Sequence, residues 1–391
     1  MAGNGNNGHG ANGSQKPPVF VVLQLSGGND FMSTVIPYAD PFYYDFRKTV
    51  GIAEKDVLKL DNRIGLHPKM KPFQEMFNQG RMAIIQGTGY PNPDRSHFRS
   101  MDIWHTAEPS KIIADGWLGK AIRDLDPEKK NVCTGVSFGQ GLPRAMYLSG
   151  TPAISVAHLE GYGLLTSLPG NEQRQAVNAF TRMYAPEEFG EASLIMGHIG
   201  QTGRDALAGA DMLKVAPQKY KSNVEYASDP LSQSLKGIAQ VHMADIGTRI
   251  FYAQHGGYDV HGSQLQSQPK LWGEVSRAVE SFFADLRAHG SSDNVVMMIF
   301  TEFGRRVRDN GNGTDHGSGG GAFLLGDRVN GGLYAEYPSL DPVKQASGDL
   351  AFNNDFRVLY STVLEKWLGL DATPIVNGTF EKFEGLIKPA A

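Results

Sequence analysis

The sequence predicts an α/β fold, a three-layer α/β/α sandwich around a mostly parallel sheet. Runs of apolar, largely β-branched residues end in glycine-rich turns, as at residues 18–30 and 82–90, which is the pattern of buried strands. Segments with helical periodicity separate these runs. Strand–helix alternation of this kind is typical of a parallel sheet covered by helices on both faces.

The individual elements follow in chain order. The first strand, in residues 18–30, ends in Gly-Gly-Asn-Asp, and the strand at 82–90 precedes a helix over 92–107 with Asp94 or Ser96 as its N-cap. Shorter strands are expected at NVCTGVSF and AISVA, and the pattern from about residue 170 to 255 is helical. A long helix closed by Gly290 and the strand NVVMMIFTEFG follow.

These elements predict one domain over residues 18–391, with a helical insertion or cap near 140–250, where the strand–helix alternation breaks. Residues 1–17 are rich in Gly and Asn and have no apolar periodicity, so we expect a disordered leader there. This leader has no apolar segment of the kind found in signal peptides.

Composition argues against several functional classes. The net charge of −4 and the pI of about 6.3 provide no basic field that would attract nucleic acid. No run reaches the roughly 18 apolar residues that a membrane span needs. The single Cys133 cannot form an internal disulfide, and it lacks the neighbouring ligands of a zinc site.

Carboxylates and imidazoles follow the predicted strands. Ligands bind beyond the carboxyl ends of the strands in open parallel sheets, so these side chains are candidate metal ligands. Taken singly, each has an ordinary structural explanation as a turn or solvated loop residue. Their combination at one edge predicts a site for Zn²⁺, Mn²⁺, Fe or Mg²⁺, with Ca²⁺ or Mg²⁺ suited to an all-oxygen subset. The candidates are Asp30, Asp259, His261, Glu302, Asp315 and His316.

Four motifs resemble those of the DUF1501 family of bacterial proteins: LSGGND, NPDRSHFRSMDIW, GGYDVHGSQ, and TEFGRRVRDNGNGTDHG followed by GGLY. The resemblance runs from residue 18 to about 385. It implies the alkaline phosphatase-like superfamily, which includes sulfatases and phosphodiesterases, and therefore the α/β/α sandwich. It also implies export by the twin-arginine route to a periplasmic or secreted location.

The resemblance implies roles for particular residues. Asp30 stands where the superfamily has its first metal-binding Asp, and Ser96 stands at a helix N-terminus where its nucleophile is expected, with Asp94 and Ser100 as alternatives. Asp259 and His261 resemble a later Asp/His metal pair. Glu302 stands at the strand end where the superfamily has an acidic metal ligand, and His316 resembles the last His of the superfamily pattern, on the loop beyond that strand. Phe303 departs from the pattern, because a metal-binding His usually stands beside that acid.

The implied function is metal-dependent hydrolysis of phosphate or sulfate esters, with a small-molecule or glycan ester as substrate. We expect one tight divalent ion on Asp259, His261 and His316, and at most a weak second ion on Glu302 and Asp30. His97 is a candidate for acid–base work and Arg305 for clamping the anion. An exported, non-catalytic binding protein and a metal-assisted hydrolase acting on a polymer by different chemistry are the alternatives.

Overall fold

A computed structural model of the chain describes residues 16–159 and 193–389, together with 171–172, 175, 178–179 and 182. Within these residues a nine-stranded sheet has the order β11-β5-β10-β9-β1-β8-β6-β7, and β12 also pairs with β5. The strands are β1 Val19–Leu25, β5 Met82–Gly89, β6 Gly135–Phe138, β7 Ile154–Val156, β8 Ile250–His255, β9 Val295–Thr301, β10 Gly320–Leu325, β11 Gly332–Tyr334 and β12 Asn354–Asp355.

The sheet is parallel except at β10, which runs antiparallel to both β5 and β9. At its centre β1 pairs in parallel with β8 on one side and with β9 on the other. The carboxyl ends of β1, β8 and β9 therefore meet at one edge, where the loops that follow them can share a site.

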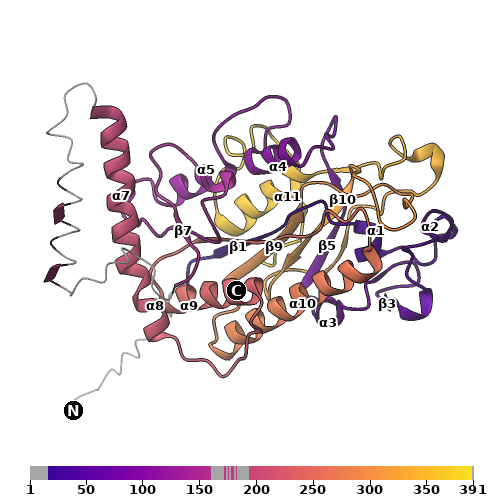
Figure 1. The fold of residues 1–391 in the computed structure, drawn as a ribbon, viewed down its shortest axis with the longest axis horizontal. Helices are drawn as coiled ribbons and strands as arrows, with labels where there is room; N and C mark the ends of the chain where they lie inside the picture. Colours follow the sequence, from indigo (N-terminus) through magenta and orange to yellow (C-terminus); the bar gives the residue numbers. More distant parts are fainter. Residues whose placement is uncertain are drawn as a thin grey trace, which may run out of the picture.

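Helices cover both faces of the sheet, α4, α5 and α11 on one and α3, α9 and α10 on the other (Figure 1). Successive residues of β1 point to opposite faces, so Val21 joins the core under α10 and α9 and Val22 joins the core under α4 and α5. The helices are α1 Phe31–Thr34, α2 Pro41–Phe46, α3 Lys71–Asn78, α4 His97–Thr106, α5 Trp117–Leu125, α7 Ser193–Leu213, α8 Val215–Lys219, α9 Pro230–Ala244, α10 Gln264–Ala288 and α11 Phe356–Val363.

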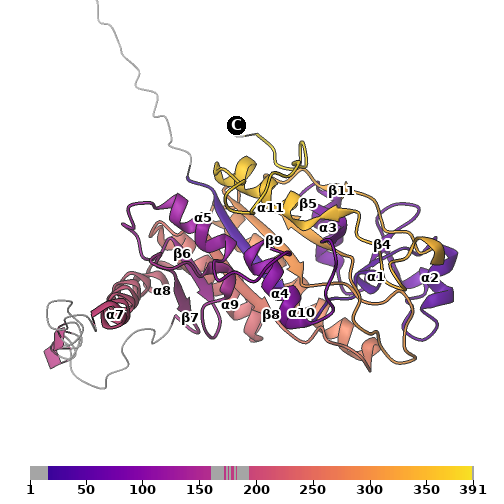
Figure 2. The same cartoon turned by 90° about the horizontal axis from the view of Figure 1, so that it is seen from above.

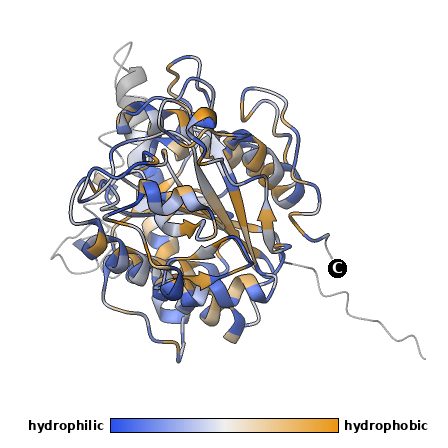
Figure 3. Ribbon diagram, turned by 90° about the vertical axis from the view of Figure 1, so that its right-hand side faces the viewer, coloured by the Kyte–Doolittle hydropathy of each residue, from blue (hydrophilic) through white to orange (hydrophobic). Residues whose placement is uncertain are grey.

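The predicted three-layer α/β fold with a mostly parallel sheet is thus confirmed. The layers are also visible from above in Figure 2, and the apolar colouring of the central strands in Figure 3 agrees with their burial. A small second sheet, β2 (Val35–Ile36), β4 (Gly65–Leu66) and β3 (Leu58–Lys59), lies at one end of the molecule beside α1 and α2 (Figure 1). No helix in the described part of the chain is long and apolar enough to cross a membrane.

The helical pattern expected up to residue 255 is wrong at its end. Helix α9 stops at Ala244, and residues 250–255 form β8, which lies between β1 and β6. The segment IFYAQH is aromatic and apolar, and its first four residues are buried, so packing inside the sheet decides its conformation. The predicted leader lies largely in residues outside the described ones, as does part of the proposed cap, and both stay predictions.

Candidate metal centre

Three segments bring imidazoles and a carboxylate to the carboxyl edge of the sheet. His97 is the first residue of α4, which follows β5. Asp259 and His261 lie in the loop after β8, and His316 lies in the long loop between β9 and β10. Chain order separates these residues by up to 219 positions, and only the topology of the sheet unites them.

Their ligand atoms converge on one point. His316 Nε2 lies 3.1 Å from His97 Nε2, 3.0 Å from His261 Nε2 and 3.0 Å from Asp259 Oδ1. Asp259 Oδ1 lies 3.4 Å from His97 Nε2 and 3.0 Å from His261 Nε2. Ligands held about 2.0–2.1 Å from a tetrahedral zinc ion are separated by roughly 3.3 Å. In the described part of the chain, His97, Asp259 and His316 form a group that could hold a metal ion, and His261 contacts Asp259 and His316 without being part of that group.

The Nδ1 atom of each imidazole, the ring nitrogen outside the converging group, contacts an oxygen that can only accept a hydrogen bond. His97 Nδ1 lies 2.8 Å from Glu302 Oε1, and His261 Nδ1 lies 3.1 Å from Asp315 Oδ1. His316 Nδ1 lies 2.8 Å from the carbonyl oxygen of Arg95. Carboxylate and carbonyl oxygens only accept hydrogen bonds, so each Nδ1 must carry the hydrogen.

In its neutral form each imidazole therefore presents an Nε2 without a hydrogen to the Asp259 carboxylate, and the hydrogen bond to Glu302 raises the pKa of His97 above its usual value. Two kinds of positive charge can balance these groups: a proton between an Nε2 atom and Asp259 Oδ1, or a cation bound by the lone pairs of the neutral rings. Outer-nitrogen contacts to carboxylates and carbonyls are also the usual supports of metal-bound histidines. The geometry fits a divalent metal ion held mainly by nitrogen.

Glu302 supports His97 from behind and is 2% exposed. Its Oε1 accepts hydrogen bonds from His97 Nδ1–H and from the Gly27 N–H, both at 2.8 Å, and its Oε2 accepts from the Thr301 hydroxyl at 2.9 Å. Burial raises the pKa of Glu302, but the hydrogen bond from His97 and those from backbone N–H groups lower it below its usual value. The structure thus places an ionised Glu302 against the outer nitrogen of His97.

Arg305 holds Asp259 in place. Its side chain is 1% exposed, and Nε donates to the Gly28 carbonyl at 2.6 Å. Nη1 donates to the Thr314 carbonyl at 2.9 Å, and Nη2 donates to Asp259 Oδ1 at 2.8 Å. Burial raises the pKa of Asp259, but the hydrogen bond from Arg305 leads the effects that bring it below the usual range. The expected role of Arg305 as an anion clamp does not fit, because its donors are already bound inside the protein.

Asp30 lies away from the imidazoles, in a buried ion pair with Arg47. Its Oδ1 accepts from Arg47 Nη2 at 2.9 Å, and its Oδ2 accepts from Arg47 Nη1, from the Ser33 hydroxyl at 2.6 Å and from Gln264 Nε2 at 2.6 Å. Burial raises the pKa of Asp30, but Arg47 more than offsets this and the pKa lies below its usual value. A guanidinium already balances this carboxylate, so the expected ligand role does not fit its surroundings.

Phe303 packs against two of the imidazoles, which also contact each other. Its ring centroid lies 4.9 Å from that of His97 and 5.1 Å from that of His316. Asp315 also lies outside the converging atoms, with Oδ1 accepting from Asn310 Nδ2 at 3.0 Å beside its contact with His261. Phe303 thus contacts the rings of two proposed ligands, at the position where the superfamily pattern has a metal-binding His.

Ser96 is the N-cap residue of α4, as one of the two expectations had it, but its side chain makes no capping hydrogen bond. It is exposed, and its N–H donates to Asp94 Oδ1 at 2.7 Å. A cavity of about 600 Å³ opens beside the metal group. Among the described residues that line it are His97, Asp259 and Glu302, with Ser26 and Arg144 but without Ser96.

Sequence reasoning did not single out Ser26, Arg144 or a ligand role for His97. Ser26 directly follows β1 in LSGGND, so its position at a strand end was a usable signal. Arg144 lies in a helical turn far from any motif, where it pairs with Asp102. Nothing in the sequence around it marks it as a cavity residue.

A family model matches residues 19–386, nearly the whole chain, and its description is "Protein of unknown function (DUF1501)". The chain belongs to the DUF1501 family. The resemblance stated from its motifs is thereby confirmed, although the family description names no activity. No curated protein sequence matches this DUF1501 chain.

Among solved structures, the DUF1501 chain is similar to an alkaline phosphatase superfamily protein from Vibrio parahaemolyticus, with a TM-score of 0.42, 11% identity, and coverage of 93% of this chain and 69% of that one. It is also similar to a sulfatase from Pseudoalteromonas sp., with a TM-score of 0.40, 13% identity, and coverage of 95% of this chain and 72% of that one. The alkaline phosphatase of the Antarctic bacterium TAB5 has a TM-score of 0.32 and 9% identity, with coverage of 82% of this chain and 94% of that one. Likeness at this level says nothing about the chemistry of this chain, which has to be argued from its own residues.

Proposed function

We propose that this DUF1501 protein is a metal-dependent hydrolase of phosphate or sulfate esters, with one tightly held divalent ion. The observation that carries the proposal is the convergence of the Nε2 atoms of His97, His261 and His316 on Asp259 Oδ1. We add His97 to the expected ligand set of Asp259, His261 and His316, because its Nε2 lies beside His316 Nε2 and Asp259 Oδ1.

The donor set favours some metals over others. Three imidazole nitrogens and one carboxylate oxygen suit Zn²⁺ or Mn²⁺, whereas Ca²⁺ and Mg²⁺ prefer oxygen ligands. A second ion on Glu302 and Asp30 has little support, because Glu302 contacts His97 and Gly27, and Asp30 contacts Arg47. We therefore propose one ion per chain.

The protein's own groups would prepare the site for ester hydrolysis. A bound divalent ion supplies Lewis acidity, which stabilises charge on a phosphoryl or sulfuryl oxygen. Glu302 keeps His97 in the tautomer that leaves Nε2 free, and Arg305 keeps Asp259 ionised and in place. The neighbouring cavity of about 600 Å³ is large enough for a small-molecule ester or the end of a glycan ester.

Two serines are candidate nucleophiles. Ser96 has the position that the family resemblance implies, next to His97 at the start of α4. Ser26 lines the cavity, and its hydroxyl oxygen accepts from Gln24 Nε2 at 2.6 Å, which leaves the hydroxyl hydrogen available. The variants Ser96→Ala and Ser26→Ala distinguish them, since loss of turnover in one variant alone identifies the reacting hydroxyl.

Turnover of aryl phosphate, bis-aryl phosphate and aryl sulfate esters by the zinc- or manganese-loaded protein tests the proposal. We expect turnover of at least one ester, and at least about 100-fold less in His316→Ala, because removal of one ligand empties or distorts the site. His289→Ala is the matched control, since His289 follows the C-terminal end of α10 and hydrogen-bonds the carbonyls of Asp285 and Lys221. Equal turnover in His316→Ala would contradict the proposal.

An exported binding protein with a single ion and no turnover is the second candidate function. Two observations favour it: the cavity lining does not include Ser96 among the described residues, and the donors of Arg305 are bound internally. Tight binding of one metal ion without hydrolysis of any of the three ester classes would support it. Its exported location rests on the family resemblance, and fractionation of the native host would test it.

A further inference from the structure

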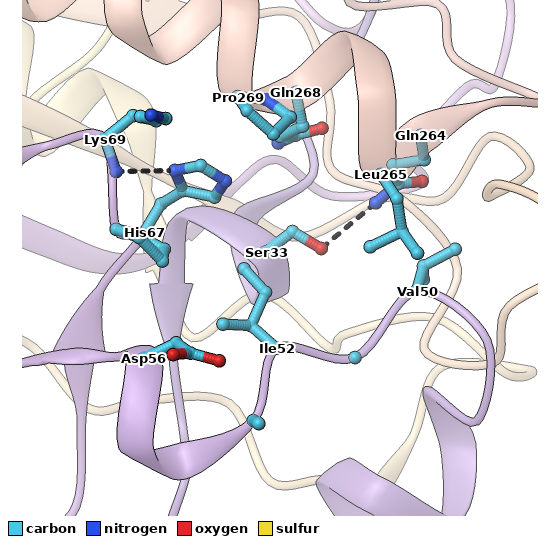
Figure 4. A pocket seen from close by; sticks show the side chains of 13 residues that line it. Ser33, Val50, Ile52, Asp56, His67, Lys69, Gln264, Leu265, Gln268 and Pro269 are labelled. Atoms are coloured by element: carbon cyan, nitrogen blue, oxygen red, sulfur yellow. Dashed lines mark hydrogen bonds between the residues drawn. The ribbon is translucent and has the colours of Figure 1, made fainter.

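A second cavity, of about 490 Å³, is lined by Ser33 and Gln264, which both hydrogen-bond Asp30 of the Asp30–Arg47 ion pair. Residues 50–53, residues 67–69 and the first turns of α10 enclose it (Figure 4). Its size falls within the usual range of about 300–1,000 Å³ for small-molecule sites. None of the candidate metal ligands lines it.

His67 offers this cavity a hydrogen-bond donor. The residue is 4% exposed, and its Nδ1 accepts from the Lys69 N–H at 3.1 Å. Nδ1 is therefore unprotonated, and Nε2 carries the hydrogen of the neutral ring. Burial lowers the pKa of His67 to about 4, so the ring is neutral at pH 7. Figure 4 shows the ring turned toward Gln268 and Pro269, and no described residue accepts from Nε2.

Two acceptors line the opposite side. Gln268 is 4% exposed, and its amide nitrogen donates to Asn29 Oδ1 at 3.4 Å, while its Oε1 accepts from no described residue. Pro269 stands inside α10 and has no N–H to donate to the carbonyl of Leu265, one turn earlier. Neither acceptor receives a hydrogen bond from the described residues through these groups, so each can accept one from a ligand.

The charges around the cavity favour an uncharged ligand. Asp56 and Lys69, both exposed, contribute opposite charges at the rim. On the floor, Ser33 and Gln264 both hydrogen-bond Asp30, so their polar groups are already engaged. The remaining wall is aliphatic and is made by Val50, Ile52, Leu265 and Pro269.

The wall at residues 50–52 is held in place without a ligand. The N–H groups of Thr49 and Val50 donate to Asp309 Oδ2 at 2.9 and 3.4 Å, and the Ile52 N–H donates to the Tyr43 hydroxyl at 3.0 Å. A preformed wall reduces the entropy cost of binding. The wall at residues 50–52 therefore needs no ligand to hold its position.

From these contacts we propose that the cavity between His67 and α10 binds an uncharged molecule that joins an aliphatic body to a hydroxyl group. The hydroxyl accepts from His67 Nε2–H and donates to one of the free acceptors on α10, Gln268 Oε1 or the Leu265 carbonyl. The aliphatic body packs on Val50, Ile52 and Leu265. This site is separate from the proposed hydrolase site and does not depend on it.

A methyl NMR titration tests the proposal with three cyclohexyl probes that differ in charge: cyclohexanol, cyclohexanecarboxylate and cyclohexylammonium. We expect cyclohexanol to shift the methyl signals of Ile52 and Leu265 saturably, and the two ions to bind at least tenfold more weakly. His67→Phe keeps a ring but removes the donor, and should weaken cyclohexanol binding about threefold to tenfold, the usual value of one neutral hydrogen bond.

A second variant guards against misfolding of His67→Phe. Leu265 is 52% exposed, so Leu265→Trp should fold, fill the mouth of the cavity and weaken cyclohexanol binding at least tenfold when followed at the Ile52 methyl. Val343→Trp, at a 91% exposed residue outside the cavity, should leave binding unchanged. Absence of saturable shifts with cyclohexanol, equal binding of either ion, or unchanged binding in Leu265→Trp would each overturn the proposal.

Discussion

Glu302→Gln is expected to weaken metal binding while leaving the fold intact. The carboxamide has the shape of the carboxylate, and its oxygen can still accept from His97 Nδ1–H and the Gly27 N–H. The Thr301 hydroxyl, which donates to Oε2 in the native protein, can rotate to accept from the new amide. The change therefore removes the buried negative charge behind His97, and an amide group replaces one of the oxygens that face the backbone N–H groups of Glu302, Gly28 and Gly27.

The contacts of Glu302 set the size of the effect. A hydrogen bond to a charged acceptor contributes about 1.5–3 kcal/mol and is roughly twice as strong as its neutral counterpart. Loss of the charge should therefore cost about 1–2 kcal/mol of metal-binding free energy, or roughly 5- to 30-fold in affinity. This overlaps the lower part of the 10- to 100-fold range that is typical when such a supporting group is removed.

Competition with a zinc chelator measures this affinity directly. Glu274→Gln is the matched control, because Glu274 Oε2 lies 3.1 Å from His255 Nε2, and neither residue belongs to the metal group. We expect Glu274→Gln to bind zinc as the wild-type protein does. A folded Glu302→Gln protein with wild-type zinc affinity would refute the support role assigned to Glu302.

Two further predictions concern stability. Burial lowers the pKa of His67, His105 and His242 from 6.5 to about 4, so below pH 6.5 the unfolded state binds more protons and stability falls toward pH 4. At pH 5 each of these histidines should lower the free energy of unfolding by about 2 kcal/mol. Urea unfolding at pH 7 and pH 5 should therefore show a smaller loss of stability in His67→Phe than in the wild-type protein, and an equal loss would contradict this. Asp30→Asn should lower stability at pH 7 by about 3–5 kcal/mol, because Arg47 keeps a buried charge without its partner, and a loss under 1 kcal/mol in the same assay would mean that the pair contributes little.

The sheet was largely predictable because its central strands are continuous apolar runs with clear ends. Strands β1, β5 and β9 are buried along their whole length and run into glycine or polar turns, so their residue pattern admits few other structures. Strand β8 was missed because only four of its six residues are buried and it follows α9 after a short connection. Its identity as a strand depends on pairing with β1 and β6.

The candidate site was predictable only in part. The strand-end rule pointed to Asp259, His261 and His316, which the structure brings within hydrogen-bond distance of one another. It could not separate them from Asp30, because the deciding neighbour, Arg47, comes from another segment and its approach is a matter of tertiary packing. The turn of His97 toward His316 depends likewise on long-range packing.

An anomalous difference map from crystals of the zinc-loaded protein, recorded at the zinc edge, tests the central claim most directly. We expect one strong peak per chain, about 2.0–2.1 Å from the Nε2 atoms of His97 and His316 and from Asp259 Oδ1, with His261 Nε2 as the fourth ligand. No peak at this point, or a stronger peak beside Asp30, would contradict the metal centre and with it the proposed hydrolase.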